Sequence, residues 1–202
     1  MKLQCGPVHD IRTLDLELPS MSKIGVLVSG GIDSVLLYYL LLCCKYRDNS
    51  SHTIQPIIIQ RPADQHVAGL MVNKINELFQ HDLPPMRLGD LSLPAHRQVE
   101  SAVRQAFTII ELEYIYLGII QVQSQHTVGI TVIETPNFLR IGYPFKYLTK
   151  SHIIDLYFKM GIQELLQHTN SCDQQQIALQ PCGICNGCKE RAWGFLECGL
   201  IQ

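Results

Sequence analysis

The chain has 202 residues, of which 47% are hydrophobic and 17% charged, a composition that suits one globular domain with a sizeable core. A formal net charge of -2 and a pI near 6.4 exclude the strong basic field that drives non-specific nucleic-acid binding, although a local patch stays open. No segment reaches the ~18 uninterrupted apolar residues of a membrane span, and the N-terminus lacks a signal-peptide core, so we expect a cytoplasmic protein.

Strand and helix patterns alternate along the first part of the chain. Residues 1–22 alternate weakly and predict a short arm or hairpin. Three apolar runs, at residues 23–28, 53–60 and 114–122, are typical of strands buried on both faces. Helical spacing of apolar residues predicts helices over residues 33–46, 67–79 and 99–110. This alternation predicts an α/β fold with a Rossmann-like parallel sheet and right-handed crossovers.

The second part of the chain is less regular. Residues 126–134 alternate like a half-exposed strand, and prolines then interrupt the pattern. Helical spacing returns after Thr149, the expected N-cap, and stops at Gly161. The chain becomes polar and rich in cysteine after residue 170, which predicts a metal-organised loop and a short helix. We therefore expect one globular unit in three parts, which are an arm at 1–22, an α/β core at 23–170 and a metal-binding segment at 171–202.

Residues 29–34, which read SGGIDS, lie where the first predicted strand turns into the first predicted helix. In a parallel sheet this point lies at a helix N-terminus, whose free N–H groups and dipole attract anions. The two glycines allow a tight turn, the two serines can donate to phosphate oxygens, and the aspartate would cap the helix or help to place a magnesium ion. The alternative is a glycine turn without a ligand. The expected phosphate-binding residues are Ser29, Gly30, Gly31, Ile32, Asp33 and Ser34.

Two familiar phosphate-binding motifs do not fit this loop. No lysine follows the glycines as in the Walker loop, and the G-x-G-x-x-G dinucleotide fingerprint is absent.

Four of the eight cysteines form the pattern C-x9-C-x2-C-x2-C, namely Cys172, Cys182, Cys185 and Cys188. Four thiolates at this spacing are typical of a closed tetrahedral zinc site, which has a structural role because no coordination position stays open. An iron–sulfur cluster is the alternative, since four thiolates also suit iron. The other cysteines, Cys5, Cys43, Cys44 and Cys198, have no activating neighbour in the sequence and are expected to be ordinary thiols.

The loop and the cysteine pattern together resemble a known family. The sequence SGGIDS resembles the SGGxDS signature of the PP-loop ATP pyrophosphatases, whose loop holds the β,γ-pyrophosphate of ATP while the α-phosphate is attacked. Residues 171–195 resemble the C-terminal pattern of the 7-cyano-7-deazaguanine synthases, the QueC family, with Arg191 on the family's arginine. Thr149 and Lys150 resemble the Ser/Thr-Lys pair that opens a helix in that family.

The resemblance implies an ATP-dependent C–N ligase with the fold of the adenine nucleotide alpha hydrolases. In the family, ATP adenylates 7-carboxy-7-deazaguanine and releases pyrophosphate, ammonia displaces AMP to give an amide, and a second ATP converts the amide to a nitrile. The implied catalytic residues are Lys150, Asp33 and Ser34, and the implied cofactors are ATP, Mg²⁺ and structural Zn²⁺. Lys150 would neutralise charge on the phosphates, and the alternative is a solvated lysine in the first turn of a helix.

The middle of the chain departs from the family. Residues 118–140 lack the aspartates, the cysteine and the arginine of the family's loop, and the Pro-x-Arg-Asn pattern before the third helix is reduced to residues 94–98. His96 and Arg97 are therefore candidates for a contact with ATP or substrate, and a plain surface role is the alternative. Because an unpaired buried polar group is costly, the loss of base-reading residues points to a different or more open substrate site.

We therefore expect a ligase that activates a deazaguanine-type carboxylate and couples it to ammonia or an amine. A protein or nucleic-acid acceptor is allowed, as in antiphage systems or deazaguanine-modification clusters, and so is a homodimer; no membrane partner is expected. One alternative is a PP-loop tRNA thiolation enzyme, which the slightly acidic composition disfavours. The other is a catalytically silent nucleotide-binding component of a defence complex, which the intact loop disfavours.

Overall fold

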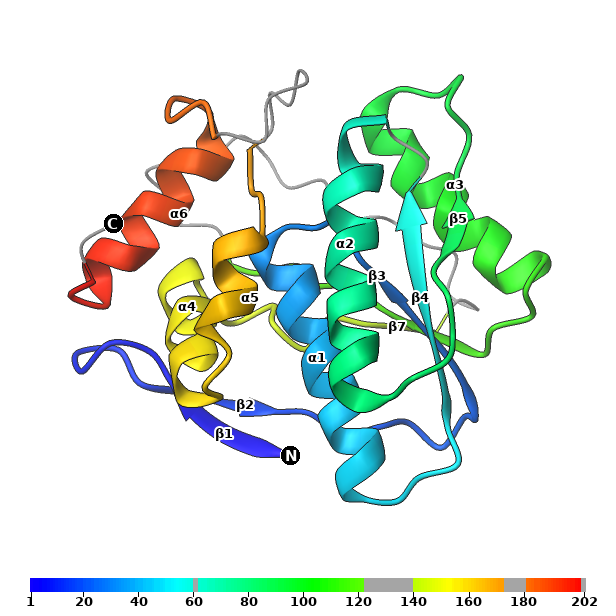
Figure 1. Cartoon of the computed structure of the whole chain (residues 1–202), viewed down its shortest axis with the longest axis horizontal. Helices are drawn as coiled ribbons and strands as arrows, with labels where there is room; N and C mark the ends of the chain where they lie inside the picture. Colours follow the sequence, from blue (N-terminus) through cyan, green and yellow to red (C-terminus); the bar gives the residue numbers. More distant parts are fainter. Residues whose placement is uncertain (60–61, 122–139, 173–180, 201–202) are drawn as a thin grey trace.

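The computed structural model describes residues 1–59, 62–121, 140–172 and 181–200 of the chain (Figure 1). Its centre is a five-stranded sheet in the order β5-β4-β3-β6-β7, in which every neighbouring pair is parallel. The strands are β3 (Lys23–Leu27), β4 (Thr53–Ile59), β5 (Met86–Leu88), β6 (Tyr114–Tyr116) and β7 (Ile141–Gly142). The predicted parallel α/β fold is confirmed.

Six helices accompany the sheet in the described part of the chain. They are α1 (Ile32–Arg47), α2 (Pro62–Phe79), α3 (Ala95–Thr108), α4 (Lys150–Lys159), α5 (Gln163–His168) and α6 (Asn186–Glu197). In Figure 1, α1, α2 and α3 begin near the edge of the sheet to which the β4 arrow points. The helix N-termini and the carboxyl ends of the strands therefore share one edge, where parallel sheets bind ligands.

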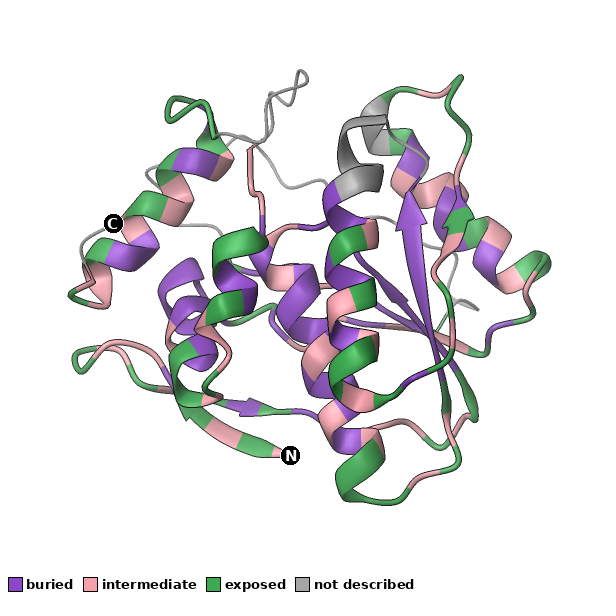
Figure 2. Ribbon diagram, in the orientation of Figure 1, coloured by how far each residue is buried: buried purple, intermediate pink, exposed green. Residues whose placement is uncertain are grey.

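The strands bury alternate residues in two cores, one on each face of the sheet. Ile54 and Ile58 of β4 enter the core that contains α1, α2 and α4, whereas Ile57 and Ile59 enter the core with α3. Successive side chains of a strand point to opposite faces of the sheet. Because both faces are covered by helices, residues on both faces of the strand are apolar, and the strand sequence is an almost continuous apolar run. Figure 2 shows β4 buried along nearly its whole length and α1 buried along most of its length, with an exposed last turn.

The N-terminal segment forms a separate two-stranded antiparallel sheet of β1 (Lys2–Cys5) and β2 (Arg12–Asp15). It docks on α4, because Gly6 N donates to Asp155 Oδ2 at 2.8 Å and Lys159 Nζ donates to the carbonyl of Gln4 at 3.1 Å. These two hydrogen bonds hold α4, the helix that carries Lys150, against the N-terminal segment.

Several boundaries differ from the sequence pattern. The strand expected over residues 114–122 ends at Tyr116 in β6, because the chain then turns over the start of α1. Gly118 marks this turn, since a Cβ there would lie 3.0 Å from Ser34 N. The short elements β5, β7 and α5 were not predicted, and the strand expected at 126–134 lies outside the described residues. No helix in the described ranges is long and apolar enough to cross a membrane.

Candidate nucleotide and metal sites

The turn between β3 and α1 is shaped by its two glycines. Gly30 has a φ of +86°, a conformation that favours glycine, and a Cβ there would lie 3.0 Å from both Ala68 N and Val67 Cγ1 of α2. Gly31 is the N-cap of α1 and supplies no side-chain acceptor. Because the first N–H groups of a helix have no intrahelical acceptor, this turn offers N–H donors to an anion.

We expect Gly30→Ala to weaken ATP binding and to lower the free energy of unfolding by about 1–3 kcal/mol, because the new methyl group meets α2 in a strained backbone conformation. Isothermal titration with a non-hydrolysable ATP analogue, together with urea unfolding, measures both effects. Gly69→Ala is the matched control, since a Cβ at this helical position meets nothing within 4 Å. Equal ATP affinity in Gly30→Ala and the unsubstituted protein would contradict the assignment of the loop.

The two serines of the loop hydrogen-bond to each other. Their Oγ atoms lie 3.0 Å apart, and Ser34 Oγ accepts a hydrogen bond from Ser29 N at 3.0 Å and lies 3.2 Å from the carbonyl of Gly31. Ser34 is buried, whereas Ser29 is exposed. Ser34 thus fixes the shape of the turn, and Ser29 is the hydroxyl of the pair that solvent reaches.

Lys150 is the buried cation of the site. Its Nζ lies 2.6 Å from Asp33 Oδ2 of α1 and 3.5 Å from Glu190 Oε2 of α6, and only 4% of its side chain is exposed. Burial alone would lower the pKa of Lys150, but the two carboxylates outweigh burial and hold the pKa above its ordinary value. Lys150 is therefore a fixed positive charge, not the solvated lysine of the alternative interpretation.

A short segment between α5 and the first cluster cysteine lies over the candidate phosphate loop, residues 29–34. Asn170 N donates to the carbonyl of Gly30 at 3.0 Å. Arg191 of α6 holds the start of this segment, because its guanidinium donates to the carbonyl of Thr169 at 3.1 Å, to Thr169 Oγ1 at 2.8 Å and to the carbonyl of Leu166 at 3.0 Å. Arg191 thus ties the C-terminal helix to the backbone that covers residues 29–34.

The four cysteines of the predicted metal site lie together. Their Sγ atoms are all within 4.8 Å of one another, with 3.9 Å between Cys182 and Cys188 and 3.9 Å between Cys172 and Cys185. Four thiolates around one zinc ion at a Zn–S distance of ~2.3 Å lie about 3.8 Å apart. A cluster of several irons would hold its thiolates farther apart, because each binds a different iron. The spacing is therefore consistent with a single tetrahedral ion such as zinc.

The backbone around the cluster favours metal binding. Cys185 N donates to Cys182 Sγ at 3.3 Å, and N–H groups of Ile184 and Cys185 lower the pKa of Cys182 to about 6. Burial raises the pKa of Cys188 to about 12. A divalent cation would take both sulfurs as thiolates, so metal binding would release protons.

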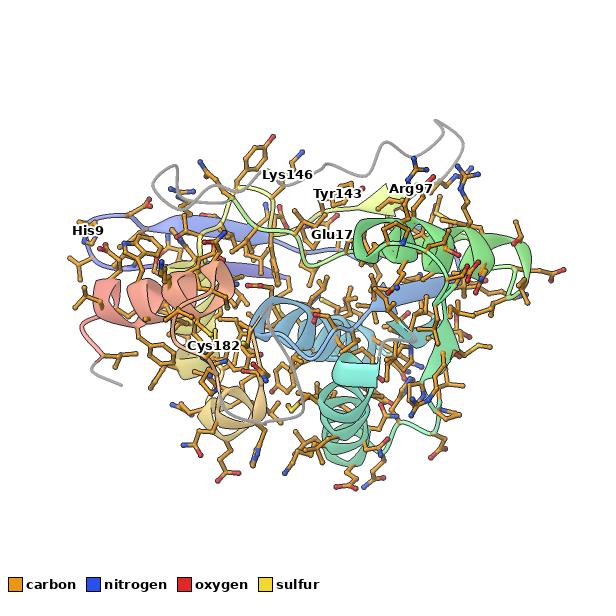
Figure 3. The ribbon with its side chains drawn as sticks, turned by 90° about the horizontal axis from the view of Figure 1, so that it is seen from above. His9, Glu17, Arg97, Tyr143, Lys146 and Cys182 are labelled. Atoms are coloured by element: carbon orange, nitrogen blue, oxygen red, sulfur yellow. The ribbon has the colours of Figure 1, made fainter. Side chains whose placement is uncertain are left out.

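The remaining sequence candidates lie apart from these contacts. Arg97 lies in the first turn of α3, with 62% of its side chain exposed, and its Nη1 lies 3.7 Å from Glu100 Oε2. Figure 3, which looks onto the carboxyl edge of the sheet, shows Arg97 and Cys182 on different sides of α1. The side chain of His96 and residues 122–139, which make up most of the altered segment at 118–140, lie outside the described residues.

Sequence reasoning missed two residues of this site. Tyr157 is fully buried, and its hydroxyl donates to the carbonyl of Ile32 at 2.8 Å, so α4 supports the first turn of α1 directly. Glu190 contacts Lys150 from a helix that begins 36 residues later in the chain. The helical spacing of Tyr157 indicated only burial, and nothing in the sequence paired Glu190 with a cation.

Comparisons with known proteins find similar sequences for part of the chain. Residues 119–199 match the family described as "Queuosine biosynthesis protein QueC". The chain is 32% identical over 74 residues to the 7-cyano-7-deazaguanine synthase of Polynucleobacter asymbioticus and 39% identical over 69 residues to that of Leptospira biflexa. The alignments cover 37% and 34% of this chain but only 29% and 27% of the relatives. The chain thus matches less than a third of the length of these curated relatives.

A solved structure of another protein shares the fold. The U34-tRNA thiolase NcsA from Methanococcus maripaludis, with its [4Fe-4S] cluster, matches with a TM-score of 0.52 and 12% identity over 94% of this chain and 77% of that chain. The NH3-dependent NAD synthetase from Campylobacter jejuni matches with a TM-score of 0.47 and 13% identity over 90% of this chain and 86% of that chain. At this identity the thiolase shows a common fold and nothing about activity.

Proposed function

The chain is a distant relative of the QueC family, and on that premise we propose that it is an ATP-dependent ligase that adenylates a carboxylate and joins it to a nitrogen nucleophile. The observation that carries the proposal is the contact of Lys150 with Asp33. These residues are 117 positions apart, yet the fold places a buried ammonium group beside the end of the candidate phosphate loop, in the first turn of α1. N–H donors at a helix N-terminus and a nearby ammonium group are both groups that stabilise anionic phosphates.

The proposed reaction has two chemical steps. A carboxylate oxygen of the substrate attacks the α-phosphorus of ATP, the bond from that phosphorus to the bridging oxygen breaks, and pyrophosphate leaves. The nitrogen of ammonia or an amine then attacks the acyl carbon, the bond to AMP breaks, and the nitrogen loses a proton. A carboxylate is a poor electrophile, and its mixed anhydride with AMP supplies the leaving group that the second step needs.

The described residues have distinct roles in this proposal. Residues 29–34 would hold the pyrophosphate, with Ser34 keeping the loop in shape, and Lys150 would stabilise the charge that develops on the phosphates. Arg97 would contribute from α3 only if its exposed side chain turned toward the nucleotide. Asp33 Oδ1 is buried and accepts no hydrogen bond from any described residue. This oxygen would suit Mg²⁺, which prefers carboxylate ligands and would neutralise the phosphates.

The proposed substrate is 7-carboxy-7-deazaguanine or a related carboxylate, which the names of the curated relatives support. The altered sequence at 118–140 supports a broader set of acceptors, including an amine on a protein or a nucleic acid, with an amide as the product. The proposal assigns residues 1–22 to a docking arm, 23–170 to the ATP-binding core and 171–202 to a zinc-binding segment that completes the site.

The alternative of a PP-loop tRNA thiolation enzyme gains no support from the [4Fe-4S] thiolase, with which the chain shares only the fold. The 3.9 Å sulfur spacings in this chain favour one metal ion over a cluster of irons, so we retain the ligase proposal.

The proposal predicts that the purified protein, given ATP, Mg²⁺ and 7-carboxy-7-deazaguanine, forms AMP and pyrophosphate in a carboxylate-dependent reaction. Asp33→Asn should lower this rate about 100-fold, because it removes the partner of Lys150 and the candidate magnesium ligand. Ion-exchange chromatography of the nucleotides measures the products. Asp48→Asn, at the other end of α1, is the control and should match the unsubstituted protein. Formation of ADP and phosphate, or normal AMP release by Asp33→Asn, would refute the proposal.

A further inference from the structure

Lys150 is held by two carboxylates that come from different elements. Its Nζ contacts Asp33 of α1 at 2.6 Å and Glu190 of α6 at 3.5 Å. Only 15% of the Glu190 side chain and 19% of the Asp33 side chain are exposed, so water screens neither contact fully. An ammonium group has three donors, and two anchors on different sides restrict its orientation more than one does.

From this geometry we propose that Glu190 is a positioning residue: it holds the ammonium group of Lys150 in place beside the end of the candidate phosphate loop, in the first turn of α1. The inference rests on the proposed function, in which Lys150 acts on the phosphates of ATP. Nothing in the sequence pattern assigned a role to Glu190, whose neighbours Cys188 and Arg191 belong to the metal site and the family motif.

Glu190 reaches Lys150 because α6 packs very closely on α4. Gly194 lies one turn after Glu190 on the same face of the helix. A Cβ at Gly194 would lie 2.9 Å from Ile154 Cδ1, 3.0 Å from Lys150 Cγ and 3.1 Å from the carbonyl carbon of Lys150. The missing side chain therefore lets the two helices approach, and the distance from Glu190 to Lys150 depends on this approach.

The cysteine cluster lies at the N-terminal end of α6, the helix that carries Glu190. Cys185 is the N-cap of α6, and Cys188 lies in its first turn, two positions before Glu190. Cys172 ends the segment that lies over the phosphate loop, since Cys172 N donates to Asn170 Oδ1 at 2.9 Å. One ion bound by these thiolates would join α6 to that segment, so the metal site would set where Glu190 stands relative to Lys150.

The effects of Glu190→Gln on kcat and on the KM for ATP distinguish a positioning role from a general loss of structure. Without the Glu190 charge, Asp33 alone orients Lys150, and the ammonium group is less well placed for the transition state. Removing a negative charge near the triphosphate does not weaken binding of ATP in the ground state. We therefore expect the turnover number to fall while the KM for ATP stays the same or decreases.

The test is Glu190→Gln, with Glu197→Gln on the same helix as the matched control, because Glu197 contacts the exposed His9 at 3.0 Å instead of Lys150. We expect Glu190→Gln to lower kcat about 10- to 100-fold with full metal content and no increase in KM. Gly194→Ala, which pushes α6 from α4, should give the same kinetic pattern. An unchanged kcat in Glu190→Gln, or a lower kcat accompanied by metal loss and a higher KM, would overturn the inference.

A second readout does not depend on turnover. In ¹⁵N-lysine-labelled protein, a buried and ion-paired ammonium group gives a protected NMR signal, which is assigned to Lys150 by its loss in Lys150→Arg. We expect Glu190→Gln to shift or broaden this signal and Glu197→Gln to leave it unchanged. An unaltered signal in Glu190→Gln overturns the inference even if AMP forms. An altered signal in a protein that forms no AMP supports the positioning and refutes the proposed function instead.

Discussion

Lys150→Met is expected to lower the rate of AMP formation about 10²- to 10³-fold and to lower the free energy of unfolding by about 3–5 kcal/mol. The loss of rate follows because, in the proposal, the ammonium group of Lys150 stabilises the charge that develops on the phosphates. Lys150 is also the only cation that contacts Asp33 among the described ion pairs. The loss of stability follows because the substitution leaves two largely buried carboxylates without their ammonium partner. Initial rates of AMP release and urea unfolding measure the two effects.

A double variant separates these two losses. Adding Glu190→Gln to Lys150→Met removes one of the stranded charges, so part of the unfolding free energy should return. Turnover should not return, because the ammonium group is still missing. If Lys150→Met kept normal AMP release, Lys150 would have no catalytic role, and its ion pairs would serve stability alone.

Cys185→Ser is expected to release the metal and to unfold the C-terminal segment. Cys185 is 8% exposed and its Sγ lies 3.9 Å from Cys172 Sγ, so the substitution removes one of the four thiolates that would bind the ion, although the backbone N–H and the N-cap position of α6 are kept. Structural zinc contributes on the order of 10–16 kcal/mol of apparent binding energy in zinc-finger peptides, which makes even partial loss severe. Elemental analysis and thermal unfolding, each before and after a chelator, measure the outcome.

Cys198→Ser is the matched control for this prediction. Cys198 lies at the end of α6, outside the cluster, and its Sγ donates to the carbonyl of Ser151 at 3.2 Å, a role that a hydroxyl can take over. The metal content and the melting temperature of the Cys198→Ser protein should stay near those of the unsubstituted protein. A soluble, fully active Cys185→Ser protein without metal would contradict a structural role. Iron and sulfide in the unsubstituted protein would contradict the zinc assignment.

The fold was predictable where the residues bury both faces of long elements. The apolar run at 53–60 and the helical spacing after it need no distant partner to be recognised, and both elements form as β4 and α2. The elements β5, β7 and α5 have 3, 2 and 6 residues, too few for a period to show. These short elements form because they pair and pack with the rest of the fold, and the local sequence pattern does not contain that information.

The candidate site was predictable in its parts but not in its assembly. The glycines of the loop and the cysteine spacing are local signals, and each depends on residues close in the sequence. The contacts of Lys150 with Asp33 and Glu190 join three segments, and a charged residue in a helix looks the same whether its partner is water or a distant carboxylate. Gly194 allows α6 to approach α4 closely, because a Cβ there would clash with α4. The sequence alone shows only a glycine within the segment that resembles the family's C-terminal pattern.

The central claim is that this chain activates a carboxylate as its adenylate, and an isotope experiment tests it most directly. The substrate 7-carboxy-7-deazaguanine is labelled with ¹⁸O in its carboxylate and incubated with ATP, Mg²⁺, ammonia and the metal-loaded protein, and mass spectrometry then measures the AMP. The proposal predicts one ¹⁸O atom in each AMP, because the carboxylate oxygen that attacks the α-phosphorus leaves with it. Unlabelled AMP, or ADP with phosphate, would contradict the proposal.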